Sequence, residues 1–231
     1  MTSFRGLLKY FTVAACVLCS VKTVSAASDS GFKNRTTVLL AGDSIMEQAT
    51  EPSVDGFISL LAGRYSRSAD MIVRALSGYN TSTSKNLIKI VEKFQAVAPD
   101  SKMMMVTPTH VGDAARKKFA AERTDSKKGL LDRSNAMMKP YARACVEAAK
   151  EAGVSVLDLY SHFDAMTVTA RDKLLVDGVH FNAAGHLVVD EKLRATILKE
   201  FPEVNDLLDT YQFPIVSRWM KDDPYVPETT K

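Results

Sequence analysis

The segment Thr37-Val38-Leu39-Leu40-Ala41-Gly42-Asp43-Ser44 is the most informative part of this 231-residue chain. Its first five residues are apolar or β-branched, which predicts a buried strand, and Gly42 and Asp43 are typical of a turn that ends one. In an open parallel sheet, ligands bind outside the carboxyl ends of the strands. Ser44 directly follows such an end, so the sequence puts a hydroxyl where a reacting group is expected.

Predicted strands and helices alternate along the chain. Strands are predicted over residues 37–41, 71–75, 102–107 and 154–159. Apolar residues at helical spacing predict helices near 57–61 and over 87–97, 130–152 and 183–200, with Pro140 kinking the third and Pro202 stopping the last. This order predicts an α/β fold with a mainly parallel sheet, in one domain over residues 27–210. Residues 211–231 are expected to form a surface strap or a disordered tail.

Residues 1–26 have the composition of a secretory signal peptide. Arg5 and Lys9 precede an apolar stretch over residues 10–21, and Val24-Ser25-Ala26 supplies the small residues of a cleavage site. An uncleaved anchor is the alternative, but the apolar stretch is short for a stable membrane span. We therefore expect a chain that is secreted or resides in the lumen of the secretory pathway.

Removal of this segment would change the charge and the cysteine content. Three of the 30 basic residues and none of the 27 acidic residues lie in it, so the mature chain would be neutral. This argues against a nucleic-acid surface, which needs a clustered basic patch. Cys145 would be the one cysteine left, so an internal disulfide could not form. Asn34, in Asn34-Arg35-Thr36, is the predicted N-glycosylation site, whereas Asn80 is expected to stay unmodified.

An acid and an imidazole lie three residues apart in Asp177-Gly178-Val179-His180. A serine hydroxyl becomes a good nucleophile when a base removes its proton and a third group fixes the tautomer of that base. Ser44, His180 and Asp177 are the candidates for these three roles. The alternative for Asp43-Ser44 is a helix cap. A metal site at Asp177, His180 and His186 has little support, because no cysteine or carboxylate cluster accompanies them.

Several segments, in this order, resemble those of the SGNH (GDSL) hydrolases and, within them, the isoamyl acetate-hydrolysing esterase-like branch: residues 42–44, 76–81, 106–108, 156–159 and 177–185. The resemblance implies a flavodoxin-like three-layer α/β/α sandwich that hydrolyses small carboxylic (acyl) esters through an acyl-enzyme. It implies no metal or organic cofactor. The charge distribution and the short apolar stretch described above already argue against a nucleic-acid partner and a stable membrane anchor. The resemblance also implies that the backbone N–H groups of Ser44 and Gly78 form the oxyanion hole.

The family's Gly-x-Asn-Asp motif, whose Asn is a third oxyanion donor, is missing from this chain. One alignment sets Val111-Gly112-Asp113-Ala114 against it, with Gly112 in place of the Asn. The preferred alignment matches residues 106–108 to a later strand, so that a central strand and its Asn are missing between Thr81 and Asn86. Residues 102–107 are then candidates to pair with residues 37–41 and close the gap, since unpaired inner strands are costly. Asn80 and Asn86 are candidate substitute donors.

Two alternatives to an active esterase follow from the missing Asn. A catalytically impaired SGNH pseudoenzyme, or a truncated isoform acting as a binding domain, would retain Ser44 and His180 without turnover. A non-hydrolytic flavodoxin-like binding protein would use residues 42–44 only as a turn, although the chain has no glycine-rich phosphate loop. Acylation of Ser44 by an activated ester would separate an active hydrolase from both.

Overall fold

A five-stranded sheet forms the centre of the computed structural model, which describes residues 16–19, 36–78 and 84–211. The strand order is β3-β2-β1-β4-β5. These strands are β1 (Cys16–Cys19), β2 (Thr36–Gly42), β3 (Ala69–Ala75), β4 (Met103–Val106) and β5 (Ser155–Leu157). β2 pairs in parallel with β3, and β4 pairs in parallel with β5. The four strands predicted from the sequence are therefore confirmed within one or two residues at each end.

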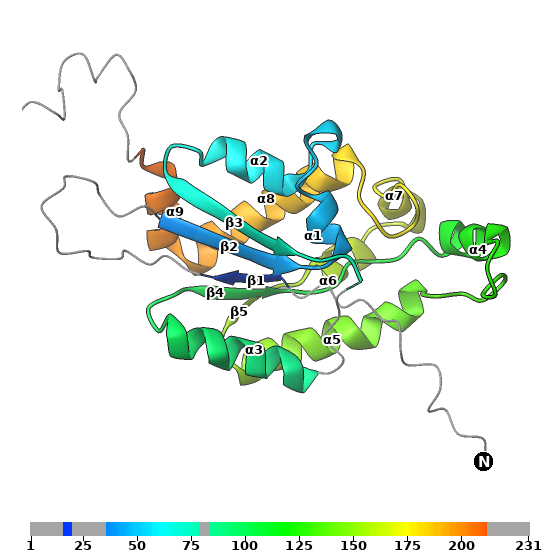
Figure 1. Ribbon diagram of the computed structural model, residues 1–231, viewed down its shortest axis with the longest axis horizontal. Coiled ribbons are helices and arrows are strands. Elements are labelled where there is room, and N and C mark those ends of the chain that lie inside the picture. Colours follow the sequence, from blue (N-terminus) through cyan, green and yellow to red (C-terminus); the bar gives the residue numbers. More distant parts are fainter. Residues whose placement is uncertain (1–15, 20–35, 79–83, 212–231) are drawn as a thin grey trace, which may run out of the picture.

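Helices cover both faces of the sheet, so the molecule has three layers (Figure 1). One face carries α3 (Ser84–Val97) and α5 (Asn135–Glu151). The other face carries α1 (Ser44–Gln48), α2 (Phe57–Arg64), α8 (Ala183–Glu200) and α9 (Pro202–Asp209). The α/β/α sandwich expected from the resemblance is confirmed.

The inner strand β4 contributes side chains to the hydrophobic cores on both faces of the sheet. Met104 packs with the α2 and α8 side of the sheet, whereas Met103 and Met105 pack with α3 and α5. All three are at most 4% exposed. Side chains alternate between the faces of a strand, so a strand buried on both faces is apolar at every position. The run of three methionines is thus core.

β1 occupies the position of the missing central strand. It pairs antiparallel with β2, with Leu18 opposite Leu40, and antiparallel with β4, with Leu18 opposite Met104. The expectation that residues 102–107 pair directly with residues 37–41 is therefore wrong, because β1 lies between them. The inner edges of β2 and β4 have backbone groups that must be paired, and residues 16–19 supply the partners. These residues belong to the predicted signal peptide.

The helices agree with the sequence in position and differ in some boundaries. α5 begins at Asn135, not near residue 130, because the Ser134 hydroxyl caps it by accepting a hydrogen bond from Met137 N at 3.3 Å. α8 matches its predicted bounds. The patterns did not predict η2 (Pro52–Val54), α4 (Asp113–Glu122), α6 (Leu159–Asp164), α7 (Val168–Asp172) or α9.

None of the described helices is long and apolar enough to cross a bilayer. Asn34, Asn80 and all but the first residue of the predicted tail at 211–231 lie outside the described residues.

Candidate active site

Ser44 lies at the carboxyl end of β2, as the first residue of α1. Asp43 is the N-cap of this helix, and its Oδ1 accepts a hydrogen bond from Ile45 N at 3.0 Å. Gly42 allows the close turn, because a Cβ there would lie 2.3 Å from Met46 Cγ. The helix-cap alternative therefore holds for Asp43 alone, and it leaves the Ser44 hydroxyl available for another partner.

Asp177 and His180 form a compact turn in the loop before α8. Asp177 Oδ1 accepts hydrogen bonds from the backbone N–H groups of Val179 and His180, both at 2.9 Å. Its Oδ2 lies 2.8 Å from His180 Nδ1. Gly178 has φ +84°, which is a conformation that favours glycine. The contact between Asp177 Oδ2 and His180 Nδ1 fixes the direction of the imidazole ring, and the two amide contacts hold the Asp177 carboxylate in place.

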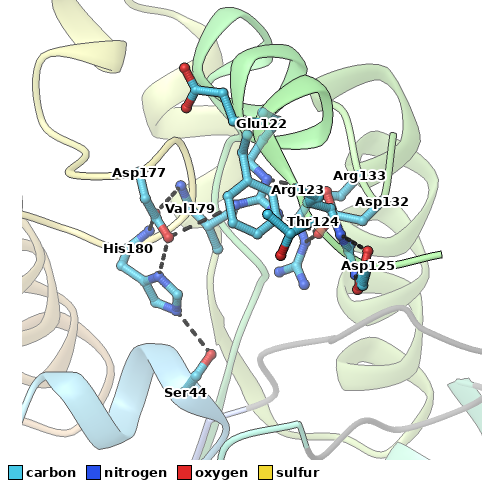
Figure 2. A pocket seen from close by; sticks show the side chains of 12 residues that line it. Ser44, Glu122, Arg123, Thr124, Asp125, Asp132, Arg133, Asp177, Val179 and His180 are labelled. Carbon is cyan, nitrogen blue, oxygen red and sulfur yellow. Dashed lines mark hydrogen bonds and ion pairs between the residues drawn. The ribbon is translucent and has the colours of Figure 1, made fainter. Parts of the chain in front are cut away.

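The structure brings the three predicted side chains together in one line (Figure 2). His180 Nε2 lies 3.1 Å from Ser44 Oγ, while its Nδ1 faces Asp177. With the proton on Nδ1, the ring donates to the carboxylate and presents a lone pair to the serine hydroxyl. The spatial arrangement is that of a nucleophile, a base and a group that orients the base.

Two carboxyl groups near this line have opposite pKa shifts. Burial alone would raise the pKa of Asp177, but the hydrogen bonds from the His180 ring and from the amides of His180 and Val179 hold it well below its usual value. The pKa of Asp43 is raised, because this side chain is 1% exposed and burial outweighs the amide of Ile45 and the charges of Arg133 and His180. Asp177 is thus the ionised partner that an imidazolium requires.

The loop that carries the predicted oxyanion donor Gly78 follows β3, and the structure describes it up to that residue. Ser77 N donates to Glu47 Oε2 at 2.7 Å and Leu76 N donates to Gly42 O at 3.0 Å, so this loop is attached to β2 and α1. Gly78 is exposed and has φ +81°. Among the substitute donors, Asn80 lies outside the described residues and Asn86 lies in the first turn of α3.

Residues 111–114, which one alignment sets against the missing Gly-x-Asn-Asp motif, form contacts that stabilise the fold. Gly112 precedes α4, and its N–H donates to Gly178 O at 2.9 Å. Asp113 Oδ1 accepts from Asn135 N at 2.8 Å, and Asn135 Oδ1 accepts from Val111 N at 3.2 Å. Residues 111–114 therefore join α4 to α5 and to the Asp177 turn, and Gly112 has no side chain to serve as an oxyanion donor.

A cavity of about 540 Å³ opens beside Ser44 and His180, under α4 and the segment that leads to α5 (Figure 2). Most of its lining residues are charged. Four of them were not predicted from the sequence as site residues: Arg116, Arg123, Asp132 and Arg133. The sequence holds a signal for them in its alternation of basic and acidic residues over 116–133, a stretch without helical apolar spacing. The lining residues are Ser44, Arg116, Phe119, Glu122, Arg123, Thr124, Asp125, Asp132, Arg133, Asp177, Val179 and His180.

Two other histidines, His186 and His110, are buried in the core away from Ser44. His186 is 1% exposed and packs between the rings of Phe57 and Phe181, at centroid distances of 5.9 and 5.8 Å. His110 is also 1% exposed, and its Nε2 lies 2.9 Å from Arg171 O. Burial lowers the pKa of each to about 4, so both are neutral in the folded protein near pH 7.

Comparison with known proteins gives relatives of one kind. The family model described as GDSL-like Lipase/Acylhydrolase matches residues 81–188, which include Asp177 and His180. A GDSL esterase/lipase of Arabidopsis thaliana is 25% identical over 242 residues, covering 82% of this chain and 96% of the relative. An isoamyl acetate-hydrolyzing esterase 1 homolog of Mus musculus is 27% identical over 198 residues, covering 64% of this chain and 76% of the relative.

The Arabidopsis alignment, at 242 residues, is longer than the 231-residue chain, so the relative has residues with no counterpart here. This fits an internal segment missing from the present chain. Among solved structures, a lipase/acylhydrolase from Enterococcus faecalis superposes with a TM-score of 0.51 at 16% identity, covering 72% of this chain and 96% of that one. The likeness shows a shared fold. The matched model and the relatives show that this chain is similar in sequence to the GDSL (SGNH) lipase/acylhydrolases, including isoamyl acetate-hydrolyzing esterase homologs.

Proposed function

We propose that this chain hydrolyses small carboxylic esters through an acyl-enzyme formed on Ser44. The observation that carries the proposal is the continuous line of contacts from Asp177 Oδ2 to His180 Nδ1, at 2.8 Å, and from His180 Nε2 to Ser44 Oγ, at 3.1 Å. Both distances are within hydrogen-bond reach, which is the geometric requirement for proton transfer by a base.

The reaction then follows from these contacts in two halves. Ser44 Oγ attacks the ester carbonyl carbon while His180 Nε2 takes the hydroxyl proton, and Asp177 stabilises the resulting imidazolium. The tetrahedral intermediate collapses with transfer of that proton to the departing alcohol, which leaves Ser44 acylated. Water deprotonated by His180 attacks the acyl carbon and releases the acid, and Ser44 Oγ takes the proton back.

The oxyanion would be held by backbone N–H groups. Ser44 N–H belongs to the first turn of α1, where amides have no acceptor within the helix. The Gly78 N–H is the second proposed donor, on the loop attached through Ser77 to Glu47. Loss of one oxyanion donor lowers kcat about 100- to 1,000-fold in other serine hydrolases. We therefore expect slow turnover in the absence of the family's Asn.

The cavity beside Ser44 favours short, hydrophilic esters over fatty ones. Phe119 and Val179 are the apolar side chains in its described lining, and the rest are polar or charged. A long acyl chain there would remove water from charged groups such as Asp132 and Arg133, and desolvation of a charge is costly. Acetyl and other short acyl esters avoid that cost. Secretion and glycosylation at Asn34 stay predictions.

The test is intact-mass analysis of the purified chain after treatment with a fluorophosphonate. We expect one adduct on the wild type, none on Ser44→Ala, and an undiminished adduct on Ser59→Ala, whose hydroxyl contacts only Thr50 O on the surface. Esters of increasing acyl length then give the chain-length preference. Absence of an adduct on a cooperatively folded wild type would contradict an activated Ser44 and favour a pseudoenzyme.

A further inference from the structure

Arg116 is a nearly buried cation within α4, with a side chain that is 6% exposed. The Asp132 carboxylate accepts two hydrogen bonds from one edge of its guanidinium, from Arg116 Nε to Oδ1 at 3.2 Å and from Nη2 to Oδ2 at 2.5 Å. The guanidinium also lies over the ring of Phe119, 4.1 Å from its centroid. A planar, bidentate contact of this kind fixes the guanidinium in one orientation.

The remaining nitrogen of this guanidinium faces the proposed acid of the triad. Arg116 Nη1 lies 3.9 Å from Asp177 Oδ2, the oxygen that also receives His180 Nδ1 at 2.8 Å. We infer that Arg116 is a positioning residue, which holds the Asp177 carboxylate toward His180 and tunes the affinity of the imidazole for a proton. This inference rests on the proposed function of Ser44, His180 and Asp177.

The backbone explains how α4 brings Arg116 to this point. Gly112 N–H donates to Gly178 O at 2.9 Å, one turn before Arg116 in the chain. A Cβ at Gly178 would lie 2.9 Å from Ala115 Cβ and 3.3 Å from Arg116 Cδ, so the glycine permits this close approach. α4 is therefore packed directly on the Asp177 turn, and movement of one would displace the other.

The electrostatic consequence has a definite sign. A cation beside Asp177 competes with the imidazolium of His180 for the same oxygen, so it favours neutral His180. Charged groups from every neighbouring element surround this pair. Asp43 lies in the turn before α1, Asp172 lies at the end of α7, and the cavity lining adds Glu122, Arg123, Asp125, Asp132 and Arg133. Replacing Arg116 with a neutral residue leaves these groups in place and removes the competing charge.

The test compares wild type, Arg116→Gln and Arg116→Lys by two measurements on each folded protein. The first is the pKa of His180 from an NMR titration of its ring, and the second is the pH profile of kcat/KM on a short acyl ester. For Arg116→Gln we expect the His180 pKa and the acid limb to move up by about half a pH unit or more, as for a charge about 6 Å away in water. For Arg116→Lys we expect the His180 pKa of the wild type but a kcat about tenfold lower. Lysine keeps the positive charge, but it cannot make the bidentate contact with Asp132 that orients the guanidinium.

Arg171→Gln is the matched control, because Arg171 is a buried arginine of α7 that pairs with Asp164 at 2.7 Å. It should lower stability without moving the His180 titration. An unchanged His180 pKa in folded Arg116→Gln would overturn the inference and leave Arg116 a structural residue. The NMR titration does not require turnover, so failure of Ser44 to react would refute the proposed function without deciding this question.

If Arg116→Gln does not fold, Asp132→Asn replaces it. That change releases Arg116 toward Asp177 and should lower the His180 pKa. Asp125→Asn is its control, because it removes a carboxylate from the same cavity that pairs with Arg123 instead. A shift no larger in Asp132→Asn than in Asp125→Asn would overturn the inference.

Discussion

His186 is a buried imidazole held in the core by aromatic rings. It is 1% exposed, and neither ring nitrogen has a hydrogen-bond partner among the described residues. Burial lowers its pKa from 6.5 to about 4. A base with a depressed folded-state pKa takes up a proton first in the unfolded chain, so acid favours unfolding between the two pKa values.

We therefore predict that His186→Leu flattens the fall in stability between pH 7 and pH 5. The wild type should lose about 1–2 kcal/mol of unfolding free energy at this residue over that range, because the unfolded imidazole is protonated while the folded one is neutral. Leucine has a similar volume and no proton to bind. Urea unfolding of both proteins at several pH values measures the difference, and parallel curves would contradict the prediction.

At the scale of elements, the approach of α4 to the Asp177 turn makes the site depend on one glycine. Gly178 has φ +84°, and a Cβ there would lie 2.8 Å from Gly112 O. The sequence marked Gly178 only as part of the spacing between Asp177 and His180. Glycine is required here both by the left-handed backbone and by the close approach of α4, a helix that the sequence pattern did not predict.

Gly178→Ala should destabilise the fold by about 2 kcal/mol or more, because the left-handed backbone costs a residue with a Cβ about 1–2 kcal/mol and the contact with Gly112 O adds to it. It should also reduce fluorophosphonate labelling of Ser44, since the turn that holds His180 must move. Gly63→Ala is the control: it has open space around its Cβ within α2 and should stabilise that helix slightly. Denaturant unfolding and intact mass measure both effects; unchanged labelling in Gly178→Ala would show that α4 and the turn move independently.

At the scale of the whole molecule, residues 16–19 have two incompatible uses. As β1 they complete the sheet between β2 and β4, but as part of a cleaved signal peptide they would be absent from the mature chain. A sheet without them would leave two inner strand edges open, which is costly in a sheet buried on both faces.

Leu18→Pro in the full chain tests this use of β1. Proline cannot donate a backbone hydrogen bond and is confined to edge strands, so at the centre of the sheet it should cost about 3 kcal/mol or more. Denaturant unfolding measures the loss, and the intact mass of the secreted or purified protein shows whether residues 1–26 are present. An unchanged unfolding free energy would mean that the folded protein does not depend on β1.

The sequence by itself determined the features that depend on neighbouring residues. The apolar run before Gly42 determined β2, the spacing from Asp177 to His180 determined their turn, and Pro202 determined the end of α8, because each is a local preference of the backbone. Only the tertiary structure decided which strand lies between β2 and β4, how α4 packs on Gly178, and that Arg116 reaches Asp177. These depend on pairing, burial and charge between segments far apart in the chain, which no local pattern records.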